Sequence, residues 1–134
     1  MSDTLQFELV TPERLALSEQ VAMVEVPGEM GDFGVLPGHA PFMSMIRPGV
    51  VKVHASDDST ARYFIPAGYA EVNPEGCIVL AEHVQNLADV SAADAEDGLK
   101  KAELDVAEAA DDAEKAKAEK ALLVAQALVE AVAA

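Results

Sequence analysis

The chain has 134 residues, enough for one small domain or for a compact domain with an appendage. Its 24 acidic and 9 basic side chains give a formal net charge of -15, which argues against direct binding to nucleic acid or to an anionic membrane surface. The single cysteine excludes an internal disulfide and fits a reducing compartment.

The composition changes near Ala88. All seven prolines and every glycine except Gly98 come before that point, whereas alanine dominates after it. We therefore expect two units, residues 1–88 and residues 89–134. The start of the chain lacks the basic segment and apolar run of a secretory signal. The most apolar tract, residues 121–134, is short and is interrupted by Gln126 and Glu130, so no membrane insertion is expected.

The first unit is predicted to consist of short strands separated by turns. Apolar residues alternate with polar ones from Leu5 to Leu9, which is typical of a half-buried strand. Many short strands at this spacing indicate an antiparallel sandwich or a flattened barrel. The remaining strands are expected at residues 15–18, 22–26, 42–46, 50–54, 62–65, 68–72 and 77–81, with a hairpin turn at residues 57–59.

Residues 26–41 hold four glycines and three prolines, and we predict a loop that turns repeatedly. A phosphate-binding loop would continue with Lys and Ser or Thr at the start of a helix, but Val35-Leu36-Pro37 follows here. Phe33 and its apolar neighbours Val35 and Leu36 are expected to be buried, whereas Asp32 and His39 can face water or a partner.

The second unit is predicted to be helical. Ser91 followed by Asp94 is a capping-box signal, and Asp111 or Asp112 is expected to cap a second helix. No glycine or proline marks the turn between two helices, so one long helix stays an alternative to a hairpin. The expected apolar stripes are Ala95, Leu99, Ala102, Val106 and Ala109 in the first helix, and Leu122, Leu123, Leu128, Val129 and Val132 in the second.

We expect no catalytic, cofactor or metal site. The three histidines are too scattered to form a metal-binding motif, and no hydroxyl or thiol lies in a nucleophile motif. The carboxylates of the helical unit lack the spacing and central glycine of a calcium loop and are interpreted as a solvated helix face. Cys77 lies in an apolar strand and is expected to be buried rather than reactive.

Several motifs together resemble the epsilon subunit of bacterial F-type ATP synthases. The most specific is Gly31-Asp32-Phe33-Gly34-Val35-Leu36-Pro37-Gly38-His39-Ala40-Pro41, supported by Arg47-Pro48-Gly49, Ile65-Pro66-Ala67-Gly68-Tyr69 and Val79-Leu80-Ala81. The resemblance covers nearly the whole chain. It implies an N-terminal ten-stranded antiparallel β-sandwich followed by a C-terminal α-helical hairpin.

The resemblance also implies a function without chemistry of its own. Such a protein is a non-catalytic central-stalk subunit that links gamma to the c-ring and so couples proton translocation to ATP synthesis. It would be a peripheral component on the cytoplasmic face of the bacterial inner membrane, held by protein contacts. The residues that the resemblance places in contact with gamma and the c-ring are Asp32, Phe33, Val35 and His39.

The helical unit departs from some members of that family. In those members it binds ATP through an acidic residue followed by arginine, but residues 94–102 contain no arginine. Lys100 and Lys101 lack the guanidinium fork that holds phosphates, so no strong nucleotide site is expected. Contacts with the alpha and beta subunits would give weak or absent inhibition of ATP hydrolysis. The alternative is a free-standing β-sandwich adaptor whose acidic helical tail binds a partner.

Overall fold

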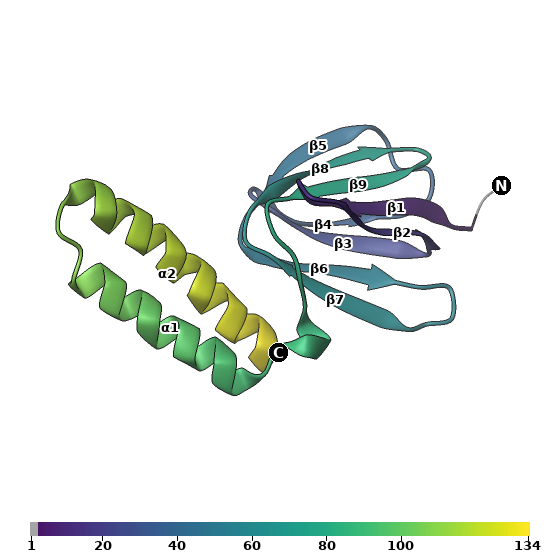
Figure 1. Cartoon of the computed structure of the whole chain (residues 1–134). Helices are drawn as coiled ribbons and strands as arrows, with labels where there is room; N and C mark the ends of the chain where they lie inside the picture. Colours follow the sequence, from purple (N-terminus) through teal and green to yellow (C-terminus); the bar gives the residue numbers. More distant parts are fainter. Residues whose placement is uncertain (1–2) are drawn as a thin grey trace. The chain divides into compact units, whose positions relative to one another are not determined.

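The computed structural model describes residues 3–134 and divides into two compact units, the first ending at Asn86 and the second beginning at Leu87 (Figure 1). The division lies two residues before the one expected from composition. The first unit contains all ten strands, and the second contains both α-helices.

Nine of the strands follow one another in a curled sheet with the order β10-β7-β6-β3-β5-β8-β9-β1-β2, and β4 pairs with β3. Neighbouring strands are antiparallel except β1 and β9, which are parallel. The strands are β1 (Leu5–Val10), β2 (Leu15–Val21), β3 (Met23–Gly28), β4 (Gly31–Val35), β5 (Phe42–Ile46), β6 (Gly49–His54), β7 (Thr60–Ile65), β8 (Gly68–Asn73), β9 (Gly76–Ala81) and β10 (Gln85–Asn86).

The sheet folds over where β3 meets β5. These two strands share one register pair, Gly28 with Ile46, whereas β3 and β6 share three. Figure 1 accordingly shows β5, β8, β9 and β1 on one side of the unit and β3, β6 and β7 on the other. The expectation of a ten-stranded sandwich is confirmed.

The core lies between these layers. In β1 the alternate residues Leu5, Phe7 and Leu9 are buried, as the sequence pattern predicts. Burying an apolar side chain of this size contributes roughly 1.5–3 kcal/mol. The other large contributors are Val21, Val24, Val26, Val35, Val51, Val53, Ile65, Val72 and Val79.

Residues 26–41 do not form the continuous loop that we predicted. Their first part ends β3, and β4 pairs back on it, with Phe33 opposite Val26 and Asp32 opposite Pro27. Only Glu29 and Met30 separate the two strands. The glycines of β4 give it a weak strand signal, but pairing with β3 overrides that local preference. Leu36 follows β4 and is exposed, contrary to expectation.

The turn between β3 and β4 requires glycine at both ends. A Cβ added to Gly28 would lie 2.6 Å from the carbonyl oxygen of Gly31, and Gly31 has a φ of 132°. A side chain would collide with backbone at the first position and would be strained at the second. The glycines therefore set the shape of this hairpin.

The second unit is a hairpin of two helices, which excludes the single long helix. After the 3-10 turn η1 (Leu87–Asp89) come α1 (Ala92–Ala107) and α2 (Asp112–Ala133), which pack against each other (Figure 1). The Oγ of Ser91 accepts a hydrogen bond from the Asp94 amide at 3.1 Å. Asp111 caps α2 by accepting from the Glu114 amide at 2.8 Å.

The predicted stripe of α1 is confirmed for four of its residues, since Ala95 and Ala102 are buried and Leu99 and Val106 are half-buried. It was wrong for Ala109, because α1 ends at Ala107. In α2 the prediction was wrong for Leu123, which is exposed. Its neighbour Leu122 is half-buried, and one residue further along a helix turns the side chain by about 100°. Within residues 3–134, no helix combines the length and the apolar character needed to cross a membrane.

Candidate functional site

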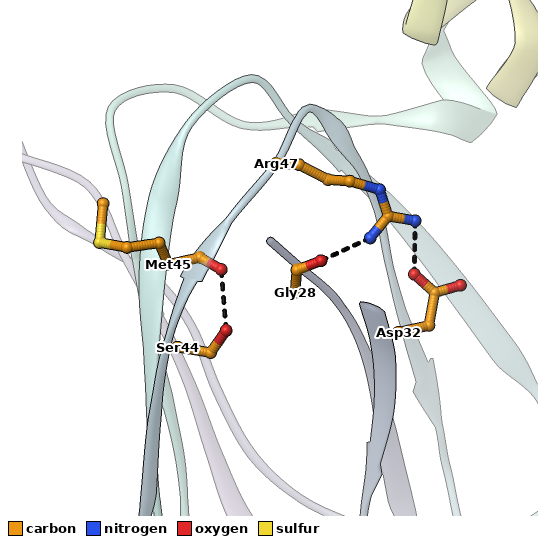
Figure 2. A network of polar contacts seen from close by, with 5 residues as sticks. All are labelled: Gly28, Asp32, Ser44, Met45 and Arg47. Atoms are coloured by element: carbon orange, nitrogen blue, oxygen red, sulfur yellow. Dashed lines mark hydrogen bonds and ion pairs between the residues drawn. The ribbon is translucent and has the colours of Figure 1, made fainter. Parts of the chain in front are cut away.

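The first candidate surface is the end of the β3–β4 hairpin, residues 28–32, which we call the hairpin tip. Asp32 stands there with 73% of its side chain exposed. Arg47, from the connection between β5 and β6, lies against it with Nη2 2.5 Å from Oδ1 of Asp32. The Nη1 of Arg47 donates to the Gly28 carbonyl oxygen at 2.7 Å (Figure 2). One guanidinium therefore bonds to both strands of the hairpin.

The backbone fixes Arg47 in the same place. Its amide donates to the Pro27 carbonyl oxygen at 3.1 Å, and the Glu29 amide donates to the Met45 carbonyl oxygen at 2.8 Å. These bonds join the end of β3 to the end of β5. The hairpin tip is thus held by backbone bonds below it and by the Arg47 side chain across it.

The other predicted contact residues lie beside the tip. The rings of Phe33 and Phe42 meet edge to face, with centroids 5.1 Å apart and planes at 84°, a favoured aromatic geometry. The half-buried His39 lies 6.5 Å from Phe42, measured between ring centroids. Phe42 thereby connects Phe33 with His39. Sequence analysis did not identify Phe42 as a site residue. The available signal was an aromatic residue directly after Ala40-Pro41, and the structure shows that Phe42 is exposed.

Val35 differs from the other three predicted contact residues. Val35 and Phe33 lie on the same inward face of β4, but Val35 is fully buried in the core whereas Phe33 is half-buried. Val35 can anchor β4 beneath the surface, but its side chain has no area to offer a partner. Asp32 lies on the other face of β4 from Phe33 and Val35, because successive side chains in a strand point to opposite sides.

A second surface, which sequence analysis did not find, crosses the outside of five strands. Register pairing aligns Met45 of β5 with Tyr69 of β8, Tyr69 with Leu80 of β9, Leu80 with Val10 of β1, and Val10 with Leu15 of β2. We call these five residues the outer row. Met45, Tyr69 and Leu15 are 58%, 36% and 53% exposed. Leu80 and Val10, between Tyr69 and Leu15 in the row, are half-buried. Apolar side chains on one outward face of this kind mark protein-binding surfaces.

Two titratable groups away from these surfaces have a raised pKa, Cys77 and Tyr63. Burial raises the pKa of the Cys77 thiol to about 12, which leaves it protonated and weakly reactive. Burial, with a smaller contribution from Glu19, raises the pKa of Tyr63. Among residues 3–134, no three His, Cys, Asp or Glu side chains lie close enough together to hold a metal ion.

The helical unit has an open cleft of about 370 Å³ between the end of α1 and the start of α2. Its polar lining is formed by Asp105, Glu108, Glu114 and Lys117. Three of these four side chains are acidic, so the cleft offers little to attract a phosphate group.

Comparison with known proteins identifies the family of this chain. The family model described as "ATP synthase, Delta/Epsilon chain, beta-sandwich domain" matches residues 4–87. The chain belongs to the ATP synthase delta/epsilon family. An ATP synthase epsilon chain from Rhodospirillum rubrum is 44% identical over 98% of both chains. An epsilon chain from Maricaulis maris is 47% identical, covering 94% of this chain and 92% of its own.

Solved structures show the same fold for this delta/epsilon chain. A chain of the Euglena gracilis mitochondrial ATP synthase, from a structure of "OSCP/F1/c-ring", superposes with a TM-score of 0.87 at 22% identity, covering 98% of this chain and 83% of that one. A chain from the "central stalk/cring" of the Tetrahymena thermophila enzyme gives a TM-score of 0.66 at 11% identity, covering 96% of both. This chain thus shares its fold with chains of two mitochondrial ATP synthases.

Proposed function

We propose that the chain is a non-catalytic central-stalk subunit of an F-type ATP synthase, which links gamma to the c-ring and couples proton translocation to ATP synthesis. The observation that carries this proposal is the presence of two different exposed surfaces, the outer row and the hairpin tip, on one densely packed β unit. Family membership and the c-ring assemblies that contain its structural neighbours support it.

The two surfaces suit different partners. The outer row is apolar, and removing apolar surface from water contributes roughly 25 cal/mol per Å², so it suits a lasting contact with gamma. The hairpin tip presents the paired charges of Asp32 and Arg47 beside His39 and Phe33, which suits the polar loops of the c-ring. Val35 contributes from below by anchoring β4. A subunit held at both surfaces transmits torque by contact alone.

This role places the chain at the periphery of the membrane, on the cytoplasmic face of the bacterial inner membrane. The helical unit lies outside the coupling function in this proposal. It has weak or no influence on ATP hydrolysis, because α2 has basic side chains only in its first half, and the region carries no arginine. Deleting residues 89–134 and measuring ATP hydrolysis by the complex tests this point, and a large rise in activity would refute it.

Binding to a purified gamma and c-ring complex that lacks this subunit tests the main proposal. The wild-type chain is expected to bind, and Met45→Glu is expected to weaken binding at least tenfold because it places a charge in the apolar outer row. Ser56→Glu is the matched control, since it adds the same charge at an exposed turn away from both surfaces. Failure of the wild-type chain to bind would refute the proposal.

A further inference from the structure

We infer that Arg47 is the positioning residue for Asp32, and that its guanidinium fixes the Asp32 carboxylate in the geometry in which the hairpin tip meets the c-ring. This inference rests on the proposed function. It deepens that function by naming the side chain on which the contact made by Asp32 depends.

The guanidinium of Arg47 bridges two groups rather than forming a simple ion pair with one. Two nitrogens of the same guanidinium bond to different strands, Nη1 to the Gly28 carbonyl oxygen and Nη2 to Oδ1 of Asp32 (Figure 2). The third bond, from the Arg47 amide to Pro27, fixes the base of the side chain. A planar guanidinium with several donors can make such divergent bonds, whereas an ammonium is a point charge.

Within residues 3–134, no side chain other than Arg47 bonds to the Asp32 carboxylate, so this restraint is needed to order it. Its side chain is largely exposed, and it follows a turn of two residues between glycines. A free carboxylate at this place would lose rotamer freedom when a partner bound it, and that loss weakens association. Arg47 orders the carboxylate beforehand through one oxygen. A carboxylate has further acceptor positions, so Asp32 can still accept a hydrogen bond from a polar loop.

The same contact adds little to the stability of the fold. Both side chains are substantially exposed, 44% for Arg47 and 73% for Asp32, and exposed ion pairs stabilise proteins only weakly. A positioning role therefore predicts that loss of the Arg47 guanidinium damages binding while leaving thermal unfolding nearly unchanged. A purely structural role predicts that the same loss lowers the unfolding temperature while binding by the folded chain stays nearly unchanged.

A double-mutant cycle separates these roles. The affinities of wild type, Asp32→Asn, Arg47→Met and the double variant are measured for the gamma and c-ring complex that lacks this subunit. We expect each single variant to bind roughly tenfold more weakly and the double variant to be no weaker than Asp32→Asn, because Arg47 acts only through Asp32. Unfolding midpoints of the isolated variants should lie within about 4 °C of wild type.

Arg47→Lys tests the fork itself. Lysine keeps the charge but cannot bond to Gly28 and Asp32 as guanidinium does, so its affinity should stay well below that of wild type. Full rescue by lysine, or additive losses in the double variant, would overturn the inference. So would normal binding by Arg47→Met when Asp32→Asn binds weakly. If the wild-type chain does not bind, the proposed function fails and this inference falls with it.

Discussion

Met45 and Tyr69 face each other across β5 and β8, and both side chains lie on the outside of the unit. Their chain neighbours Ile46 and Ala70 point the other way and are buried in the core. This layer of the sheet therefore has apolar side chains on both faces. One face stabilises the fold, and the other remains available for a partner.

The first prediction compares two leucines on the opposite faces of this layer. Leu9 is buried in the core and Leu15 belongs to the outer row. Leu9→Ala should lower the free energy of unfolding by about 2–5 kcal/mol because it leaves a cavity. Leu15→Ala should change it by less than about 1 kcal/mol. Urea unfolding of the isolated chain measures both, and equal losses would contradict the assignment of faces.

The second prediction concerns the turn between β6 and β7. The Ser59 hydroxyl donates to Oδ1 of Asp57 at 2.6 Å, and the Ser59 amide donates to the same oxygen at 3.0 Å. These bonds, the hydroxyl bond first, lower the pKa of Asp57 below its ordinary value of 3.8. Ser59→Ala should raise the pKa of Asp57 toward that value, which carboxyl-carbon NMR titration measures.

The sign of the accompanying stability change follows from the lowered pKa. The contribution of Asp57 is fully present above its unfolded pKa and is lost as the pH falls through its folded pKa. Ser59→Ala should therefore reduce the loss of stability on acidification below about pH 4. An unchanged titration of Asp57 in the variant would show that the Ser59 hydroxyl has no effect.

The third prediction concerns Cys77. Burial raises the pKa of its thiol to about 12, so almost no thiolate exists at pH 8. The folded chain should react with iodoacetamide far more slowly than the chain unfolded in guanidinium chloride. Mass spectrometry follows the modification. Equal rates in the two states would mean that Cys77 is accessible in the folded protein.

The fourth prediction compares two glycines. A Cβ added to Gly98 in α1 would meet no atom within 4 Å, so Gly98→Ala should stabilise the helix by about 1 kcal/mol. Gly28→Ala would force a Cβ against the Gly31 carbonyl and should destabilise the β3–β4 hairpin. Amide hydrogen exchange should slow in α1 for the first variant and quicken in the hairpin for the second. The opposite pattern would contradict the geometry.

Local pattern was sufficient to predict the main elements. The alternation from Leu5 to Leu9 identifies both a strand and its inner face, because side chains in a strand point to opposite sides in turn. Ser91 and Asp111 mark the starts of the helices because their side chains bond to amides that lack a partner within the helix. These signals lie within a few residues of the feature that they predict.

The features that local pattern missed depend on pairing between distant segments. The strand β4 has a glycine-rich sequence and exists because β3 lies beside it. The outer row is assembled from five strands, and only their register aligns Leu15 with Met45 across the layer. Arg47 and Asp32 lie 15 residues apart and meet because the ends of β3 and β5 are joined. None of these relationships can be predicted from a single stretch of sequence.

Reconstitution of the rotor tests the central claim most directly. The purified chain is mixed with the gamma and c-ring complex that lacks it, and size-exclusion chromatography with mass measurement reports the assembly. We predict one copy of the chain per complex, retained by Ser56→Glu and lost when Met45→Glu is combined with Asp32→Ala. Elution of the wild-type chain on its own, separate from the complex, would contradict the account.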